Sequence, residues 1–429
     1  MDKRAFLKFT GAGLAAAPML SFAQQDTAKK PFYTDTKIAN ITASVDPISA
    51  KERSERIAKA QRLMVKNDMA AIILEPGAAM DYFTGIQWWR SERLTAVVIP
   101  QEGDIAVVTP FFEEPSVKES LQVGKDIRVW QEHESPFKQV QQILKDRGVA
   151  KGRLGFEASV RYFVLNGLMP LLPKMQNVSA EPVTLGCRMF KSDHELRLMH
   201  KANEVTLKAY THVYERLEAG MSQADVKDLM QQAQQKLGGS DLWAMALFNE
   251  GSAYPHGTRK EQILEKGSVV LMDCGCAVHG YQSDISRTFV FGEPTAKQQK
   301  VWKSVREGQQ VAFEQAQLGN TAGSVDDAVR SLYKRQGYGP DYQLPGLSHR
   351  TGHGIGMQGH ERVNFVHGEK TTLQPGMCFS NEPGIYIPGE FGVRLEDCIY
   401  MNSKGPQWFT RPPKSLAEPL GELAPLQLS

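Results

Sequence analysis

Residues 269–291 read VVLMDCGCAVHGYQSDISRTFVF and decide how the second half of the chain folds. An apolar run leads to Asp273, the dipeptide His279-Gly280 can reverse the chain, and Asp284 follows on the other side. Two strands joined at that turn place Asp273 and Asp284 opposite or diagonal to each other, on one face. We therefore predict a hairpin that presents two carboxylates from strands that are otherwise buried.

The same pattern recurs near the C-terminus. Residues 377–382 read MCFSNE, a turn-rich PGEFG follows at 388–392, and the chain returns as VRLE. A turn centred on Gly389 sets Glu382 across from Glu396, and the two-residue period of a strand puts Arg394 on the face that carries Glu396. The sequence thus predicts a second carboxylate pair.

Four acids among apolar strands need compensating cations, because an unpaired buried carboxylate costs several kcal/mol, on the order of the stability of a whole domain. Apart from Arg394, no Lys or Arg cluster in these strands supplies them. Between the hairpins, residues 349–361 read HRTGHGIGMQGHE, and the glycines let the backbone approach a site closely. One imidazole with four carboxylates suits a pair of divalent metal ions. The alternative is that the acids are exposed in turns and the histidine lies in a loop. This alternative explains any single acid well but the whole set poorly.

These residues resemble the metallopeptidases of the creatinase/aminopeptidase (M24-type) family, which includes Xaa-Pro dipeptidase (prolidase), aminopeptidase P and methionine aminopeptidase. The runs MDCG, SDISRT, NEPG and VRLED match the family closely over the last half of the chain. The resemblance implies an α+β protein with a pita-bread catalytic domain. The family's order of metal ligands, Asp, Asp, His, Glu, Glu, is matched by Asp273, Asp284, His353, Glu382 and Glu396.

The resemblance also implies how the ligands are shared. Asp273 binds one ion, His353 and Glu382 bind the other, and Asp284 and Glu396 bridge the two. The expected cofactors are two divalent metal ions, manganese first, with zinc or cobalt as alternatives, since ligand type does not choose among them.

Further catalytic residues follow from the same resemblance. Glu382 is the expected proton shuttle, and His360 is expected to donate to a developing oxyanion. His256, in the run Pro-His-Gly, matches a histidine that contacts the substrate. His349 matches another secondary histidine, and Arg394 is expected to hold a carboxylate ligand.

The chain divides into five segments by composition and pattern. Residues 1–23 predict an export signal, with Lys3-Arg4 resembling a twin-arginine signal and Ser21-Phe22-Ala23 fitting a cleavage site. We expect a polar arm at 24–50, a creatinase-like α/β domain at 51–185, the catalytic domain at 186–415 and a C-terminal tail at 416–429. The signal predicts a periplasmic protein without a stable membrane insertion, by the twin-arginine or the general secretory route.

Helix starts are predicted where a Ser is followed three residues later by an acid, as in a capping box. The second domain offers three such pairs: Ser192 with Glu195, Ser222 with Asp225, and Ser324 with Asp327. The helices are expected to cover the outer face of a curved antiparallel sheet.

Residues 82–93 are rich in aromatic and charged side chains. One interpretation is a packed loop whose aromatic residues fill a core or a subunit contact. The other is that Trp88 and Arg90 reach the active site of a neighbouring subunit and limit peptide length. Since trans contributions of this kind occur in the family, the resemblance implies a homodimer or a larger homo-oligomer.

The function implied is hydrolysis of Xaa-Pro bonds in a small peptide, in dipeptides or at peptide N-termini, with the Pro-His-Gly wording at 255–257 favouring a dipeptidase. A creatinase- or ectoine hydrolase-like enzyme acting on a small non-peptide substrate is the alternative, and a binding protein that has lost its site is a third. The complete ligand set favours the peptidase. The net charge of +2 and the lack of a basic stripe give no indication of nucleic-acid binding.

The five cysteines form no metal-binding motif. Cys274 and Cys276 are predicted to pack in the core on the face opposite Asp273. A disulfide between Cys378 and Cys398 remains open, because proximity across a hairpin does not by itself satisfy disulfide geometry.

Overall fold

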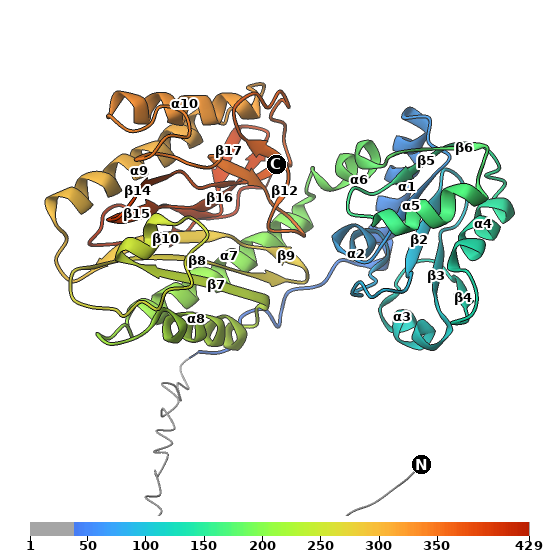
Figure 1. The fold of residues 1–429 in the computed structure, drawn as a ribbon, viewed down its shortest axis with the longest axis horizontal. Helices are drawn as coiled ribbons and strands as arrows, with labels where there is room; N and C mark the ends of the chain where they lie inside the picture. Colours follow the sequence, from blue (N-terminus) through green and yellow to red (C-terminus); the bar gives the residue numbers. More distant parts are fainter. Residues whose placement is uncertain (1–37, 429) are drawn as a thin grey trace, which may run out of the picture. The chain divides into compact units, whose positions relative to one another are not determined.

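The computed structural model describes residues 38–428. The predicted export signal and the arm up to residue 37 lie outside the described residues. Within them the chain forms an α/β sheet domain followed by a larger domain of antiparallel strands and helices (Figure 1).

The first domain is built on a six-stranded mixed sheet in the order β4-β3-β2-β1-β5-β6. The strands are β1 (Ala71–Leu74), β2 (Ala96–Pro100), β3 (Ala106–Pro110), β4 (Asp126–Trp130), β5 (Gly152–Phe156) and β6 (Met175–Ser179). The helices are α1 (Ala50–Lys66), α2 (Ala78–Thr84), α3 (Glu114–Ser120), α4 (Pro136–Asp146), α5 (Tyr162–Leu168) and α6 (Glu181–Arg188), with short 3₁₀ turns at Phe111–Glu113 and Met169–Leu171.

Both faces of this sheet are covered. Along β1, Ile72 belongs to the apolar cluster that also contains residues of α1 and α6, whereas Ile73 belongs to the cluster that contains residues of α4 and α5. Because successive side chains of a strand point to opposite faces, a strand buried on both sides reads as a continuous apolar run. The run at 71–74 is such a strand.

The second domain contains four helices and several antiparallel sheets. The helices are α7 (Asp193–Tyr214), α8 (Gln223–Leu237), α9 (Ala296–Gln315) and α10 (Ala322–Arg335), and a 3₁₀ turn spans Asn249–Ala253. The strands are β7 (Ser240–Phe248), β8 (Ser268–Val278), β9 (Tyr281–Gln282), β10 (Ile285–Phe291), β11 (Gly352–Gly354), β12 (Glu361–Phe365), β13 (Cys378–Asn381), β14 (Gly384–Ile387), β15 (Phe391–Arg394), β16 (Asp397–Asn402), β17 (Gly405–Trp408), β18 (Thr410–Arg411) and β19 (Glu422–Leu423).

One sheet has the order β10-β8-β7, with β9 paired to β8, and a second has the order β12-β11-β13-β16-β17. Strands β14 and β15 form a separate hairpin, as do β18 and β19. Helices α7 and α8 pack on the first sheet, while α9 packs on β13, β14 and β15 and α10 packs on β12 (Figure 1). The predicted α+β class, with a smaller α/β domain ahead of the catalytic one, is confirmed.

Two of the predicted helix starts are capping boxes in the structure, at Ser192 and Ser222. The third prediction was wrong: α10 begins at Ala322 after Thr321, and Ser324 lies inside the helix. The reason is tertiary, because the Ala322 amide donates to the Thr371 carbonyl at 2.9 Å and fixes the helix start at that point. The Ser324 hydroxyl donates instead to the Thr321 carbonyl at 2.7 Å.

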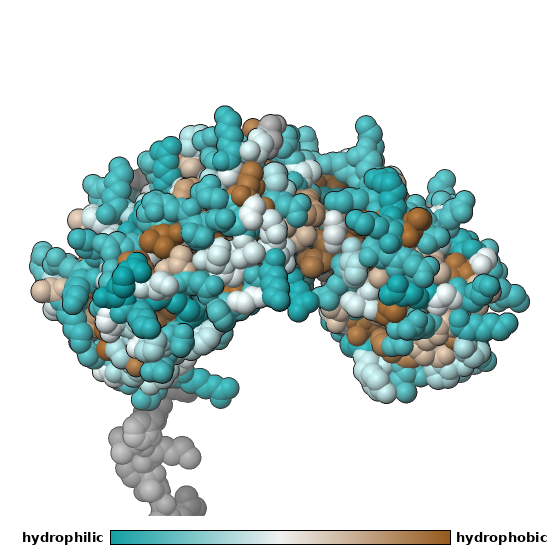
Figure 2. All heavy atoms as spheres, turned by 90° about the horizontal axis from the view of Figure 1, so that it is seen from above, coloured by the Kyte–Doolittle hydropathy of each residue, from teal (hydrophilic) through white to brown (hydrophobic). Residues whose placement is uncertain are grey.

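Among the helices that the structure describes, none combines the length and the apolar character needed to cross a bilayer. The face drawn in Figure 2 is largely hydrophilic, with apolar residues scattered over it. The five cysteines are buried and unbonded to each other. The register pairs Cys378 with Tyr400 and Cys398 with Ser380, so these two cysteines are not directly opposite.

Candidate active site

The first carboxylate pair lies on the hairpin of β8 and β10. Asp273 pairs with Ser286 across the two strands, and Asp284 directly precedes β10. Asp284 is therefore diagonal to Asp273 and on the same face, as the turn at His279-Gly280 predicted. His279 itself takes a positive φ of 48°, which fits a tight reversal.

The second pair is set by two hairpins that share one register. Gly384 pairs with Arg394 in β14 and β15, and Asn381 pairs with Asp397 in β13 and β16. The residues between these pairs continue the same register, so Glu382 lies across from Glu396. The prediction of a turn centred on Gly389, which has a φ of 76°, agrees with this arrangement.

The two carboxylate pairs meet at an isolated bridge between Ser286 and Glu396. The Glu396 amide donates to the Ser286 carbonyl at 3.1 Å, and the Ser286 hydroxyl donates to Glu396 Oε2 at 2.7 Å. Segments more than a hundred residues apart in the sequence thus bring their acids to one place.

His353 completes the set from the centre of β11. Its Nε2 lies 3.2 Å from Glu382 Oε1 and 3.6 Å from Asp284 Oδ2. Its Nδ1 lies 3.1 Å from the Gly354 carbonyl, which can accept the ring proton and leave the Nε2 lone pair facing the carboxylates. That is the tautomer a metal ligand needs.

Burial without bound cations destabilises the charged forms of these carboxylates. Burial, followed by Glu396 and Asp273, raises the pKa of Asp284 well above 3.8. Burial also raises the pKa of Glu396, with Glu382 adding to the rise, and it raises the pKa of Glu382 to about 7. The pKa of His353 falls well below 6.5, chiefly through burial, so the imidazole is neutral.

Three carboxylate oxygens in this cluster are buried and have no hydrogen-bond partner among the described residues: Asp273 Oδ1, Asp284 Oδ1 and Glu396 Oε1. Ligand atoms of Asp273, Asp284 and Glu396 lie within 4.8 Å of one another, as do those of His353, Glu382 and Glu396. Oxygen donors with one imidazole suit divalent cations. The residues present therefore fit a pair of metal ions.

Arg394 supplies one positive charge to the cluster. Its Nη2 donates to Asp273 Oδ2 at 2.5 Å and its Nε donates to the Ser286 hydroxyl at 2.9 Å. Its Nη1 donates to the hydroxyl of Tyr386 at 3.1 Å. One guanidinium against four carboxylates leaves most of the negative charge uncompensated.

Tyr386 is a residue of this site that sequence reasoning missed. Its hydroxyl lies 2.7 Å from His349 Nε2, so it joins that histidine to Arg394. The pKa of His349 falls to about 3, through burial and then through Arg394. The sequence offered only the position of Tyr386 as an indication. It follows the NEPG run on a strand, where alternate residues share a face.

His360 and His256 are both exposed and line the cavity over the cluster. The His360 ring centroid lies 4.1 Å from that of His353, and His360 can also share an ion with Asp284 and His353. Burial, with Arg350 next, lowers the pKa of His360, which favours its neutral form. The cavity has a volume of about 810 Å³, and Asp241, which sequence reasoning also missed, lies on its wall.

Trp88 and Arg90 lie in the first domain, and within the described chain neither lines this cavity. The Trp88 ring stacks on Trp89 at 4.3 Å, and its indole nitrogen donates to Glu113 Oε2 at 3.3 Å. Arg90 Nε donates to the Pro76 carbonyl at 2.9 Å. Trp89 is 64% exposed, so the loop presents an aromatic surface. Its reach into a second subunit stays a prediction.

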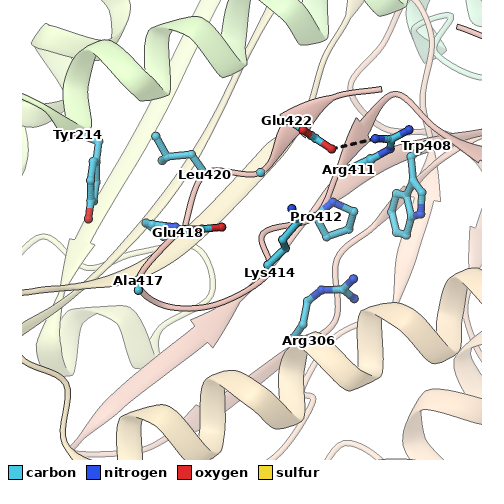
Figure 3. Close-up of a pocket in the computed structure, with 12 residues that line it drawn as sticks. Tyr214, Arg306, Trp408, Arg411, Pro412, Lys414, Ala417, Glu418, Leu420 and Glu422 are labelled. Atoms are coloured by element: carbon cyan, nitrogen blue, oxygen red, sulfur yellow. Dashed lines mark hydrogen bonds and ion pairs between the residues drawn. The ribbon is translucent and has the colours of Figure 1, made fainter. Parts of the chain in front are cut away.

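A second cavity of about 530 Å³ shares no lining residue with the first (Figure 3). Much of its wall comes from the segment between Arg411 and Glu422. The side chains of these two residues form an ion pair at 2.8 Å. Arg306 of α9, Tyr214 of α7 and Trp408 of β17 complete the lining.

Two family models match the chain. The Creatinase/Prolidase N-terminal domain matches residues 56–190, and Metallopeptidase family M24 matches residues 197–403. The chain is 32% identical to the probable dipeptidase PepE of Mycobacterium tuberculosis over 361 residues, which cover 83% of this chain and 94% of that protein. The chain belongs to the M24 metallopeptidases.

Solved structures give the same result. Dipeptidase PepE from Mycobacterium ulcerans superposes with a TM-score of 0.78 at 30% identity, covering 85% of this chain and 96% of that one. Prolidase from Thermococcus sibiricus superposes with a TM-score of 0.76 at 28% identity, covering 83% and 96%. The family suggested by the ligand motifs is confirmed.

Proposed function

We propose that this protein is a metal-dependent Xaa-Pro dipeptidase. The observation that carries the proposal is the buried donor set, in which three carboxylates each keep one unpartnered oxygen around a neutral imidazole. Relatives named Xaa-Pro dipeptidase, such as the 29% identical protein of Lactobacillus delbrueckii subsp. lactis, support the bond that is cleaved.

Each residue has a role in this proposal. Asp273, Asp284 and Glu396 would hold one ion, and His353, Glu382 and Glu396 have donor atoms close enough together to hold another. When bound, two divalent ions supply Lewis-acid polarisation of the peptide carbonyl and of the attacking water.

The proton steps fall to side chains. Glu382 faces the cavity and takes a proton from the water that attacks the scissile carbonyl carbon. It delivers that proton to the leaving nitrogen as the C–N bond breaks. His360, neutral and exposed to the cavity, donates to the carbonyl oxygen as its charge develops. His256 lies on the same cavity and orients the peptide.

Arg350 supports a dipeptide rather than a longer peptide. Its side chain lines the cavity, where its charge acts to lower the pKa of Glu382 without a hydrogen bond or ion pair to it in the described range. A free C-terminal carboxylate one residue beyond the scissile bond would supply the missing anion. A longer peptide would place an uncharged amide there.

The test uses metal-free protein reconstituted with Mn²⁺ and, separately, with Zn²⁺. Ala-Pro, Ala-Pro-Ala and Ala-Ala are offered, and products are identified by mass spectrometry. We expect Ala-Pro to be cleaved and His353→Ala to abolish the cleavage, while His367→Ala, at an exposed site, leaves it unchanged. Survival of all three peptides with metal bound would refute the peptidase proposal, and preference for Ala-Pro-Ala would indicate an aminopeptidase.

Three finer features are part of the proposal. Manganese is supported by the oxygen-rich donor set. Export to the periplasm is supported by the Lys3-Arg4 segment, and a homodimer by the exposed aromatic loop at Trp88 and Trp89. Elemental analysis, cell fractionation and light scattering test them in turn.

A further inference from the structure

Arg287 is fully buried beside the metal-ligand cluster, yet it is not part of it. It lies on β10, and its Nη1 donates to the carbonyls of Ser286 at 3.0 Å and Glu396 at 2.8 Å. Its Nε donates to the Leu420 carbonyl at 2.7 Å. A single guanidinium therefore holds three segments that are distant in the sequence.

The charge of Arg287 is neutralised by Asp397, which is also fully buried. Arg287 Nη2 lies 2.7 Å from Asp397 Oδ1. Gln309 Nε2 donates to Asp397 Oδ2 at 2.9 Å, and the Thr410 hydroxyl donates to Oδ1. Asp397 thus has partners on both oxygens, whereas the adjacent Glu396 has a buried oxygen with none in the described chain. Asp397 and Glu396 are adjacent in the sequence, but only Asp397 has both carboxylate oxygens paired within the described chain.

The hydrogen bonds of Arg287 fall where the two carboxylate pairs meet. The bridge between Ser286 and Glu396 is the isolated strand contact at which the hairpin of Asp273 and Asp284 touches the segment of Glu396. Arg287 donates to the backbone on both sides of that bridge. Its fork geometry, with several donors in one plane, is suited to fixing a distance between two carbonyls.

We propose that Arg287, braced by Asp397, is a positioning residue that sets the separation between Asp284 and Glu396, two carboxylates from different segments that would hold metal together. The inference rests on the metal site of the proposed function. Its physical basis is that ligands from separate segments have to be held in one geometry before a metal ion binds, and groups behind the ligands supply that order.

The C-terminal segment completes this arrangement. The loop between β18 and β19 brings the Leu420 carbonyl to Arg287, and Figure 3 shows Leu420 on that loop beside the second cavity. Gly421 has a φ of 74°, and a Cβ there would lie 2.3 Å from the Arg411 carbonyl and 3.3 Å from Arg287 Nη2. The close approach therefore requires a glycine.

The first test compares Arg287→Lys with the wild-type protein by calorimetric titration of Mn²⁺ into metal-free samples. Lysine keeps the positive charge, but three donors on one nitrogen cannot serve the three carbonyls and Asp397 together, as the spread guanidinium does. We expect Mn²⁺ affinity to fall by about 10- to 100-fold. The proposal would be overturned if Arg287→Lys bound two Mn²⁺ ions with wild-type affinity.

A matched control separates positioning from ordinary stability. Glu75→Gln removes a buried acid from its ion pair with the partly exposed Arg161, at 2.7 Å, in the first domain. Both variants should lower the unfolding midpoint in urea, but only Arg287→Lys should weaken Mn²⁺ binding. An equal loss of affinity in Glu75→Gln would also overturn the proposal.

Gly421→Ala tests the loop if Arg287→Lys does not fold. Gly319→Ala is its control, because Gly319 has a φ of 87° and a Cβ added there would meet no atom within 4 Å. The control therefore carries the backbone strain alone. Weakened Mn²⁺ binding in Gly421→Ala but not in Gly319→Ala supports the proposal, and equal affinities contradict it.

The readout separates this inference from the proposed function. Failure of the wild-type protein to bind Mn²⁺ or Zn²⁺ would remove the metal site itself. Metal binding without peptide cleavage would remove the assigned substrate and leave the test of Arg287 intact.

Discussion

Glu361 and Glu396 are both buried acids in one domain, and their surroundings are opposite. Glu361 lies between Arg188 and Lys191, the latter 3.1 Å away, and these cations lower its pKa to about 2 although burial acts in the other direction. Burial raises the pKa of Glu396, and one of its oxygens has no partner in the described chain.

The difference shows that burial of an acid does not by itself indicate a ligand site. Where the protein supplies its own cations, as around Glu361, the carboxylate is a structural anchor. Where acids gather around a single contacting guanidinium, as around Arg394, bound cations are needed to keep them ionised.

The largest effect is expected for Glu382→Gln, which keeps the shape of the side chain and removes its charge. Loss of a ligand and of the proton carrier together should lower kcat/KM for Ala-Pro by at least about 10³-fold. The measurement is steady-state hydrolysis at saturating Mn²⁺. Activity within tenfold of wild type would place the site elsewhere.

The next effect is on stability, measured by urea unfolding of metal-free protein. Glu361→Gln leaves Arg188 and Lys191 without their anion and should cost about 3–5 kcal/mol. Glu396→Gln removes a carboxylate that repels its neighbours, so the free energy of unfolding should rise. If both variants lost stability to the same extent, the two acids would not differ as described.

The pH dependence of metal-free protein should separate the two regions. Glu361 has a folded pKa of about 2, below its ordinary 4.5, so its contribution is present above 4.5 and is lost as pH falls toward 2. Glu382 has a folded pKa of about 7, so its contribution is present below 4.5 and is lost as pH rises through 7.

The free energy of unfolding of metal-free protein should therefore fall between about pH 5 and about pH 8. Saturating Mn²⁺ should remove this fall, because ions bind the deprotonated carboxylates. Urea titrations at several pH values, with and without Mn²⁺, measure both pH profiles of the free energy of unfolding. A flat profile without metal would contradict the raised pKa of Glu382.

The smallest effect is expected for Arg350→Ala. Loss of a charge-assisted contact to the substrate carboxylate should raise KM for Ala-Pro by about tenfold or more. The amide Ala-Pro-NH₂ has no carboxylate, so its kinetics should be the same for both proteins. An equal rise in KM for the two substrates would mean that Arg350 acts on the site and not on the carboxylate.

Much of the fold followed from local patterns. The pairs at Ser192 and Ser222 predicted helix starts, because a capping box depends on neighbours in sequence. The start of α10 did not follow, since a backbone contact from Thr371 decides it. Long-range contacts override capping preferences of this size.

By itself, the sequence determined the order of the candidate ligands and the register of their hairpins, because turn position and the two-residue period of a strand set which acids share a face. The tertiary structure alone decided which buried acids are paired with a lysine or arginine side chain from a distant segment. Glu361 begins β12 and Glu396 forms the isolated bridge just before β16, and only the folded chain brings Arg188 and Lys191 to the first. It alone also brought Tyr386 to His349 and Arg287 to Glu396, since such partners are chosen by packing between distant segments.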